Sequence, residues 1–401
     1  MLVLVANLGS TSFKCKLFDL TDGSQRVLAH GAADRIGQGD SSWVVTRTGE
    51  EEHTLKGSQD LTDHAAAIKL QLDGLLRLKV IRSIRDLGAI GFKAVHGGPI
   101  SGSVRVTDEV LETMEQFADV APAHNPPYVA AMRAFRKMLP DTPQVAAFET
   151  GYHQTIPMAR QIYAIPWEWT KELGIRRYGF HGASHRYIAT RMGEIAPEAK
   201  RIISLHLGGS CSISAIEDGQ SVGNSFGMTT QSGVFHNNRV GDFDAFAMLK
   251  LLRTGQSTES IFRRLGQEGG LLGISGVSPD MREVRESAEQ GNERAKLAVD
   301  AFVESCRHYL GAYLVALGGA DAIVFTGGIG QNNPWLREAV CQGLGFAGIE
   351  LDAAKNDAAG GDAEHRLDQD GSRAGIWVLP TNEELIVARQ TAEVLGESRG
   401  D

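Results

Sequence analysis

Apolar and polar positions alternate along this 401-residue chain with two periods, one typical of strands and the other of helices. In the first part of the chain, short strand-like stretches come first and longer helical stretches then lead into one further strand. This order predicts a mixed α/β domain that ends near residue 150. The strands are predicted near residues 2–6, 12–19, 27–32 and 144–148, and the helical stretches near 63–80 and 108–138.

The second part of the chain repeats this order, with two strands before its helices. A long amphipathic helix near 291–317 is predicted to end at Gly318 and Gly319. The other elements predicted here are strands at 201–206 and 211–217 and a helix near 242–253.

The length of the chain predicts two domains, because one core rarely serves 401 residues. We assign the first domain to residues 1–150 and the second, with nucleotide binding and dimerisation, to residues 151–383. A last helix at about 384–398, capped by Thr381 or Asn382, is predicted to return to the first domain.

Two stretches, residues 3–19 and 203–218, share one layout of strand, glycine and serine turn, and second strand. In each, an acid follows twelve positions after the polar residue that ends the first strand. These pairs are Asn7 with Asp19 and His206 with Asp218. Turns of this kind present backbone N–H groups and hydroxyls that cradle phosphate. The pattern therefore predicts a duplicated chain with one phosphate-binding turn in each half.

A third glycine-rich segment, FTGGIG at residues 325–330, follows an apolar stretch. We interpret it as a small-residue turn that precedes a helix beginning at Pro334. Three such loops predict a nucleotide between two lobes. Because phosphoryl transfer must exclude water, we expect the lobes to close about hinges at Thr150–Gly151 and residues 381–384.

Composition narrows the class of partner. With 42% hydrophobic and 22% charged residues the chain is an ordinary globular sequence, and its net charge of -9 disfavours nucleic acid and anionic membranes. It has no apolar run of 18 residues and no basic leading segment. Its four cysteines lack metal-type spacing, which is typical of the reducing cytoplasm. Residues 356–371 are of low complexity, and we predict a surface loop there.

Motifs spread from Asn7 to Glu383 resemble those of the acetate kinase family of short-chain carboxylate kinases. Several motifs in the family's order are far more specific than one glycine loop. The resemblance implies a duplicated actin/hexokinase-like (ribonuclease H-like) fold with a cleft between its domains, and a homodimer. It also implies reversible, Mg²⁺-dependent transfer of the γ-phosphoryl group of ATP to a small carboxylate, which forms an acyl phosphate. The motifs are NLGSTSFK (7–14), VHGG (95–98), APAHNPP (121–127), YHQTIP (152–157), RYGFHGASHR (177–186), GVSPDMR (276–282), FTGGIG (325–330) and PTNEE (380–384).

The resemblance also implies roles for individual residues. Arg239 and His181 would act on the transferring phosphoryl group with Lys93 and Glu149 as further catalytic residues, and a guanidinium suits phosphoryl oxygens. Asn7 and Glu383 would position Mg²⁺. The acceptor pocket would contain Lys93, Val95, Ala123, Phe180 and Thr230, and ATP or ADP would contact Lys14, His206, Gly208, Gly209, Ser210, Asp280, Met281, Arg282, Gly328, Ile329, Gly330 and Asn332.

Several positions depart from the family pattern. Lys93 stands where the family has arginine, and Glu149 stands where it has aspartate. Lysine loses the bidentate geometry of arginine, and the longer glutamate moves its carboxylate by roughly 1.5 Å. In the pocket, Ala123 replaces leucine and Thr230 replaces proline. The remaining departures are His236, Asn237 and Asn238 for Met-Gly-Thr, and Gly209 for asparagine. Together with Ala123 and Thr230, the His-Asn-Asn run predicts an acceptor pocket that is larger and more polar than acetate requires.

These departures leave three functions open. The first is an acyl kinase whose acceptor is larger or more polar than acetate. The second is a kinase that phosphorylates a hydroxyl, with Glu149 as the general base that such chemistry requires. The third is a nucleotide-binding sensor with vestigial turnover. The sequence does not decide between ATP and another phosphoryl donor, nor the direction of the reaction.

Structural interpretations compete with these roles. Asn7 and His206 can simply cap strand ends, Lys93 can be a surface lysine, and Arg282 can pair with Asp280. The pair His181 and His185 has a spacing that can bind zinc on a helix, but Gly182 and the lack of a third ligand disfavour it. Arg239 lies in a polar run that we predict to open a helix, and this suits phosphate better than packing.

Overall fold

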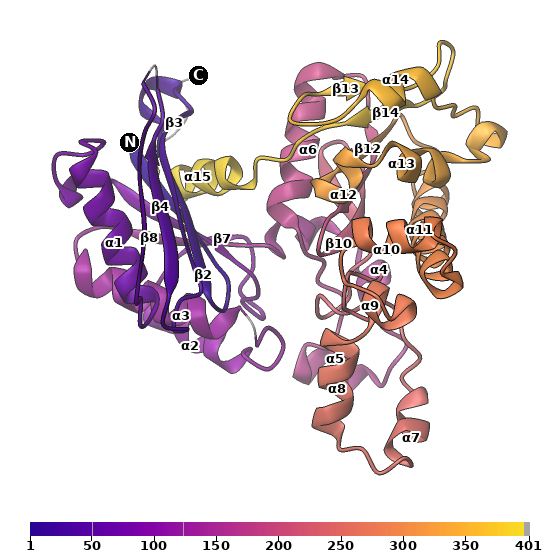
Figure 1. Ribbon diagram of the computed structural model, residues 1–401, viewed down its shortest axis with the longest axis horizontal. Helices are drawn as coiled ribbons and strands as arrows, with labels where there is room; N and C mark the ends of the chain where they lie inside the picture. Colours follow the sequence, from indigo (N-terminus) through magenta and orange to yellow (C-terminus); the bar gives the residue numbers. More distant parts are fainter. Residues whose placement is uncertain (50, 123, 397–401) are drawn as a thin grey trace. The chain divides into compact units, whose positions relative to one another are not determined.

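The computed structural model describes residues 1–49, 51–122 and 124–396 (Figure 1). Within these ranges the chain divides into two compact units, and each is described by itself. The first unit contains Met1–Gly151 and the segment from Asn382 onward, and the second contains Tyr152–Thr381.

The first unit is built on a mixed sheet. Among the described residues its strand order is β5-β4-β3-β2-β1-β6-β8-β7. Strands β1 to β5 pair with one another in antiparallel fashion, whereas β1, β6 and β8 run parallel. The strands are β1 (Leu2–Leu8), β2 (Ser12–Asp19), β3 (Arg26–Asp34), β4 (Ser41–Arg47), β5 (His53–Gln59), β6 (Ala89–Ala94), β7 (Ser103–Arg105) and β8 (Gln144–Phe148).

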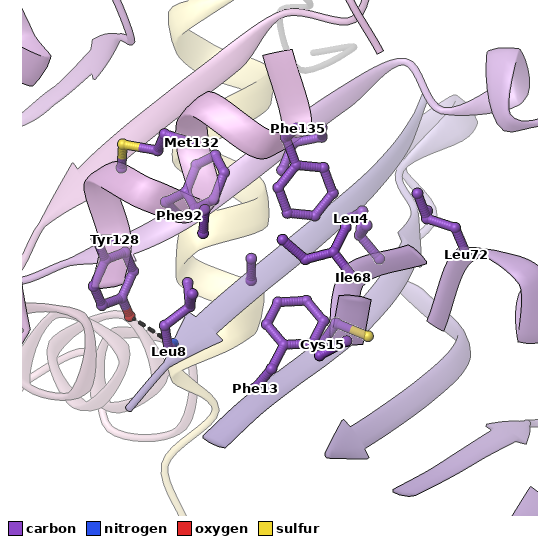
Figure 2. Packing of buried hydrophobic residues seen from close by; sticks show 14 of the residues in the cluster. Leu4, Leu8, Phe13, Cys15, Ile68, Leu72, Phe92, Tyr128, Met132 and Phe135 are labelled. Atoms are coloured by element: carbon purple, nitrogen blue, oxygen red, sulfur yellow. Dashed lines mark hydrogen bonds between the residues drawn. The ribbon is translucent and has the colours of Figure 1, made fainter. Parts of the chain in front are cut away.

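Helices cover both faces of this sheet. On one face, Phe92 of β6 packs edge-on against Phe135 with ring centroids 5.6 Å apart, and Leu4 and Phe13 belong to the same core (Figure 2). On the other face, a Cβ atom added at Gly91 would lie 2.4 Å from Oγ1 of Thr391, so glycine lets the last helix approach β6 closely. The helices are α1 (His64–Arg77), α2 (Asp108–Gln116) and α3 (Asn125–Met138), and on the second face α15 (Glu383–Val394).

The second unit repeats the arrangement. Its strand order in the described residues is β11-β10-β9-β12-β14-β13, and the run β11-β10-β9-β12-β14 matches β3-β2-β1-β6-β8 of the first unit. In both runs three antiparallel strands are followed by two that are parallel to the third. This confirms the predicted duplication. The strands are β9 (Arg201–Leu207), β10 (Cys211–Glu217), β11 (Gln220–Asn224), β12 (Ala322–Thr326), β13 (His365–Arg366) and β14 (Gly375–Val378).

The two faces of the second sheet are covered by different helices. Alternate residues such as Ile203 and Phe325 pack under α11, whereas Ser204 and Val324 point to the face that α6 covers. The helices are α4 (Met158–Gln161), α5 (Trp167–Leu173), α6 (Gly182–Ile195), α7 (Ala247–Leu252), α8 (Thr258–Gln267), α9 (Gly270–Ser275), α10 (Met281–Glu289), α11 (Glu293–Ala316), α12 (Gly327–Asn332), α13 (Pro334–Cys341) and α14 (Ala353–Ala358).

The structure corrects three of the predicted elements. The single helical stretch at 108–138 is two helices, because Pro126 and Pro127 fit only the first turn of α3. The FTGGIG segment is not a turn, since α12 begins directly at Gly327. Arg239 does not open a helix: the predicted helix at 242–253 is only α7, eight residues further on.

The low-complexity segment is not a simple surface loop. Asn356 is buried, and its side-chain and backbone oxygens accept hydrogen bonds of 2.8 and 2.9 Å from the guanidinium of Arg337. Arg337 is fully buried and also donates to the carbonyls of Gly330, Gln331 and Ala359. A buried guanidinium is tolerated when its donors are all satisfied. Arg337 thus ties α12 to the end of α14.

Two compositional expectations can be compared with the described residues. The cysteines there, Cys15, Cys211, Cys306 and Cys341, are free thiols buried in the interior. The helices in the same ranges are all too short or too polar to cross a lipid bilayer.

Candidate active site

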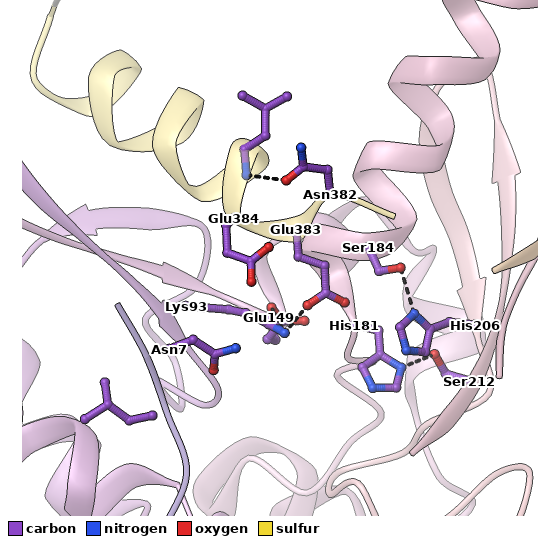
Figure 3. A network of polar contacts seen from close by, with 12 residues as sticks. Asn7, Lys93, Glu149, His181, Ser184, His206, Ser212, Asn382, Glu383 and Glu384 are labelled. Atoms are coloured by element: carbon purple, nitrogen blue, oxygen red, sulfur yellow. Dashed lines mark hydrogen bonds and ion pairs between the residues drawn. The ribbon is translucent and has the colours of Figure 1, made fainter. Parts of the chain in front are cut away.

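Charged side chains gather where the parallel strands of the first unit end. Asn7 lies near the end of β1, Lys93 near the end of β6, and Glu149 directly follows β8. Strand register aligns these ends, and the N–H of Glu149 donates to the carbonyl of Ala94 at 2.8 Å. Glu383, the first residue of α15, joins them (Figure 3). The fold therefore brings together four residues that are distant in sequence.

Lys93, Glu149 and Glu383 form what we call the Lys93 cluster. Nζ of Lys93 donates a hydrogen bond to Oε2 of Glu383 and lies 4.0 Å from Oε1 of Glu149. The side chains are only 17%, 14% and 6% exposed for Lys93, Glu383 and Glu149 respectively. Burial alone would lower the pKa of Lys93, but the charges of Glu383 and Glu149 outweigh it and raise this pKa above its ordinary value. One ammonium between two carboxylates leaves a net negative charge.

Tyr128 of α3 fixes the side chain of Asn7. Its hydroxyl donates to Oδ1 of Asn7 at 3.2 Å. The same hydroxyl accepts the N–H of Leu8 at 3.0 Å (Figure 2). Burial raises the pKa of Tyr128 above its ordinary value, so the hydroxyl stays a donor. The sequence prediction missed this residue, because a tyrosine on the apolar face of a helix looks like core. Lys14 lies opposite Asn7 in the β1–β2 pairing, with its side chain exposed.

A second ion pair lies beside the cluster. Nζ of Lys16 is 3.3 Å from Oε2 of Glu384, and these side chains are more exposed than those of the Lys93 cluster. This pair was also not predicted.

The second unit contains a chain of histidines and serines on the α6 face of its sheet. His181 precedes α6 in the left-handed backbone region, with φ of 55°, which is uncommon for a residue other than glycine. Its Nδ1 is 2.8 Å from Oγ of Ser212 (Figure 3). The same oxygen is 2.8 Å from Nε2 of His185. Nδ1 of His185 is in turn 2.9 Å from Oγ of Ser204. Ser212 thus links the predicted catalytic histidine to a buried one.

His185 is structural, as the sequence analysis favoured over zinc binding. Both of its ring nitrogens contact serine hydroxyls, and burial holds its pKa well below the ordinary value, so the ring is neutral. His206 lies at the end of β9, where its Nδ1 contacts Oγ of Ser184 at 2.8 Å. Its ring centroid is 4.1 Å from that of His181.

Arg239 lies in irregular backbone and reaches the turn that follows β9. Its Nη1 donates to Oγ of Ser210 at 3.3 Å and to Oγ1 of Thr230 at 3.4 Å. None of the ion pairs formed among the described residues involves this side chain, and burial lowers its pKa from the ordinary value. A half-buried guanidinium held only by neutral groups is suited to bind an anion.

The structure corrects the interpretation of His236 as a polar addition to the acceptor pocket. This residue is fully buried, and its Nδ1 accepts the N–H of Cys211 at 2.6 Å. Burial, aided by Arg239, lowers its pKa to about 3, so it is neutral. His236 therefore supports the backbone of the turn. Asn237 and Asn238 are only half-buried.

The predicted acceptor-pocket residues are divided between the units. Val95 follows β6 in the first, whereas Phe180 and Thr230 belong to the second. Phe180 is buried against Phe226, with ring centroids 5.6 Å apart. Ala123 lies outside the described residues.

The predicted nucleotide residues, apart from Lys14, belong to the second unit. Gly208, Gly209 and Ser210 form the turn between β9 and β10. Asp280 caps α10 and forms an ion pair of 2.6 Å with Arg282, which is the structural interpretation of Arg282 considered from the sequence. Met281 is buried in the core, so only its backbone can face a ligand. The side chain of Asn332 donates to the carbonyl of Gly328 at 3.0 Å, and Ile329 and Gly330 complete that turn of α12.

Comparison with known proteins decides the family. A model described as the acetokinase family matches residues 2–389. The chain belongs to this family. It is 40% identical over 397 residues to the acetate kinase of Shouchella clausii, covering 98% of this chain and 99% of that one. It is 38% identical over 400 residues to the propionate kinase of Escherichia fergusonii, covering 98% and 96%. The crystal structure of Porphyromonas gingivalis acetate kinase matches with a TM-score of 0.88 at 37% identity, over 98% of this chain and 99% of that one.

Membership of the acetokinase family confirms two predictions. The fold is the duplicated α/β fold, and the protein is an enzyme, a phosphotransferase with a carboxyl group as acceptor. This favours an acyl kinase over the hydroxyl kinase and the sensor considered from the sequence.

The acetokinase family uses ATP or ADP, generally with Mg²⁺, and the residues of this kinase fit both. A Cβ atom added at Gly208 or Gly209 would meet nothing of the protein closer than 3.6 Å and 3.8 Å, so the protein does not itself fill the space beside this backbone. The Lys93 cluster and Asn7 offer hard oxygen donors with an excess of negative charge. Mg²⁺ is typically held by one or two carboxylates together with phosphate oxygens, and this cluster offers such carboxylates.

Proposed function

We propose that this kinase reversibly transfers the γ-phosphoryl group of Mg²⁺-bound ATP to a small carboxylate that is larger or more polar than acetate. The observation that carries the acceptor proposal is the hydroxyl of Thr230, which lies 3.4 Å from Nη1 of Arg239. The family pattern has proline at this position, and proline has no such hydroxyl. An acceptor with its own polar substituent therefore has a hydrogen-bond partner beside the arginine.

Arg239 and His181 are assigned to the transferring phosphoryl group. Its transition state is loose and spreads charge over three oxygens, so catalysis needs positioned cations and donors more than covalent chemistry. Arg239 is suited to this because neutral groups alone hold its guanidinium. His181 is suited because the contact of 2.8 Å between its Nδ1 and Oγ of Ser212 fixes the orientation of the ring.

The acceptor needs no general base, since a carboxylate is already ionised at pH 7. Glu149 is accordingly assigned a charge role in the Lys93 cluster, where its carboxylate lies 4.0 Å from the ammonium of Lys93. Lys93 is assigned to the acceptor carboxylate.

ATP would supply the phosphoryl group, and Mg²⁺ would neutralise its negative charge. Asn7 and Glu383 are assigned to the cation, with Glu149 as a third oxygen donor. The backbone of the Gly208–Ser210 turn and His206 are assigned to the phosphates, together with Lys14. The adenosine side is assigned to Asp280, Met281, Arg282, Gly328, Ile329, Gly330 and Asn332.

The test is ADP release with Mg²⁺ and ATP across a panel of small carboxylates and hydroxy acids, with and without hydroxylamine. Hydroxylamine traps acyl phosphates as hydroxamates and does not react with phosphate esters. We expect the highest kcat/KM for an acid with a polar substituent, and we expect hydroxamate to form. If acetate or propionate had the highest kcat/KM, the acceptor proposal would be wrong.

The variant Thr230→Val sharpens this test because it keeps the shape of the side chain and removes only the hydroxyl. We expect it to lower kcat/KM for the best polar acid about tenfold and to change that for propionate by less than about twofold. Equal losses for both acids would mean that Thr230 acts on packing and not on acceptor choice.

We also propose that the kinase is a homodimer. Large apolar side chains are exposed on α5, α7 and α8, which gather at one end of the second unit (Figure 1). They include Trp167, Leu173, Phe246 and Phe262, each more than half exposed. Apolar side chains exposed in such numbers are typical of a protein interface. Analytical ultracentrifugation tests this, and a monomer at micromolar concentration would contradict it.

A further inference from the structure

The ammonium group of Lys93 takes the oxygens that the proposed function assigns to a metal. Its Nζ donates to Oε2 of Glu383, the first residue of α15, and lies 4.0 Å from Glu149 (Figure 3). The ion pair is mostly buried, so solvent screens it weakly. A lysine placed in this way is not directed at an acceptor. It neutralises part of the metal-binding cluster.

The chemistry of the side chain allows it to change partners. Lysine carries a compact charge on a flexible stem of four carbons, whereas the planar fork of arginine is held in one orientation by several donors. Two cations that share the oxygens of Glu383 repel each other, so Lys93 and a divalent cation compete for this carboxylate. When the carboxylate of Glu383 binds a metal, the ammonium of Lys93 needs a new anionic partner.

We propose that Lys93 couples metal binding to acceptor binding. In the enzyme without metal, Lys93 holds Glu383 and Glu149. When a divalent cation binds there, Lys93 releases Glu383 and turns to the carboxylate of the acceptor. This inference rests on the proposed function, because it takes Glu383 as a metal ligand and Lys93 as the acceptor's cation.

Two consequences follow from this exchange. Lys93 lowers the affinity of the enzyme for the metal, so its removal makes metal binding tighter. The metal also raises the affinity for the acceptor, and by thermodynamic linkage the acceptor raises the affinity for the metal by the same factor. A lysine that only binds the acceptor has neither effect on the metal.

The first experiment measures Mn²⁺ binding to the full-length enzyme by the EPR signal of the free ion. We expect Lys93→Met to bind Mn²⁺ at least about tenfold more tightly than the wild type, because it removes the positive charge that contacts the carboxylate assigned to the ion. The matched control is Lys16→Met, which removes the same charge from the neighbouring pair with Glu384. We expect it to change the Kd by less than about twofold to threefold. The proposal would be overturned if the Kd of Lys93→Met for Mn²⁺ were equal to or larger than that of the wild type.

A third variant separates failure of this inference from failure of the proposed function. Glu383→Gln should lose most of the Mn²⁺ affinity. If it binds Mn²⁺ as the wild type does, Glu383 is not a metal ligand and the proposed metal site is wrong. If Glu383→Gln loses Mn²⁺ while Lys93→Met leaves it unchanged, the metal site stands and only the coupling is wrong.

A measurement on the wild type avoids any folding defect in Lys93→Met. The Kd of the best carboxylate from the acceptor panel is measured by calorimetry with and without saturating Mn²⁺. We expect the metal to lower this Kd at least about fivefold. Equal values in the two titrations would overturn the proposal, as would tighter acceptor binding in the absence of metal.

Discussion

The hydroxyl of Ser212 contacts two histidines, and its removal should lower both the free energy of unfolding and kcat. Its Oγ lies 2.8 Å from Nδ1 of His181 and 2.8 Å from Nε2 of His185, and both Ser212 and His185 are fully buried. The variant Ser212→Ala takes a hydrogen-bond partner from two imidazole nitrogens. Each loss costs about 1–3 kcal/mol when the group is buried, and less at the partly exposed His181. We therefore expect a destabilisation of about 2–4 kcal/mol.

The same substitution should lower kcat, because Ser212 fixes the ring that we assign to the phosphoryl group. We expect a loss of about ten- to hundredfold in kcat, with the KM for ATP within about twofold of wild type. Ser204→Ala is the matched control. Ser204 is equally buried and lies 2.9 Å from Nδ1 of His185, whereas the hydroxyl that contacts His181 is that of Ser212. It should lose about 1–2 kcal/mol of stability and keep kcat within about threefold.

The assays are urea unfolding followed by circular dichroism and steady-state kinetics at a temperature where each variant is folded. A Ser212→Ala enzyme with the stability and kcat of the wild type would refute the assigned network. A Ser204→Ala enzyme that loses as much kcat as Ser212→Ala would show that the effect on turnover comes from the histidine chain as a whole and not from the contact with His181.

Three further predictions concern other parts of the chain. Arg239→Ala should lose at least about a thousandfold in kcat/KM, because it removes the cation assigned to the transition state, and retention of most turnover would show that the phosphoryl site is misassigned. Burial lowers the pKa of His153 to about 4 and that of His236 to about 3. Histidine in the unfolded chain has a pKa of about 6.5, so below this pH the unfolded chain binds more protons than the folded one, and the free energy of unfolding should fall as the pH drops from about 6.5 toward 4. A midpoint of urea unfolding that stays constant across this range would contradict this prediction. Arg337→Met should destabilise the second unit by about 3–5 kcal/mol, because it leaves buried carbonyls of α12 and α14 unpaired, and an unchanged melting temperature would contradict the role of this arginine.

Much of the fold was predictable because its signals are local. The duplicated hairpins were visible in the alternation of residues 3–19 and 203–218, and β8 and α11 were predicted within a few residues. The edge strand β5 and its neighbour β4 were missed, and β5 is exposed over most of its length, so it has no apolar face to give it a pattern. The segment at Gly327 was misjudged because glycine usually disfavours helices. Here Gly327 has φ of 76°, and a Cβ atom would lie 2.6 Å from the carbonyl of Leu207, so packing against β9 requires glycine.

The candidate site was predictable only where a motif marked it. Nothing in the local sequence of Lys93 indicates that Glu383, 290 positions later, lies against it, because that contact depends on the return of α15. Ser204 and Ser212 carried a weaker signal. A buried strand with serine on every second position implies a polar network on one face, since buried hydroxyls need partners.

Helix α15 has a consequence for how the chain is made. Every other element of the first unit precedes Gly151, whereas α15 is translated after the whole of the second unit. During synthesis the second unit can therefore finish folding first, while β6 still lacks Val387 and Thr391, which pack against Gly91. Lys93 lacks Glu383 during the same interval. A chain released before residue 383 would carry an uncovered sheet and an incomplete charged cluster, so the last step of translation completes both the hydrophobic core and the cluster.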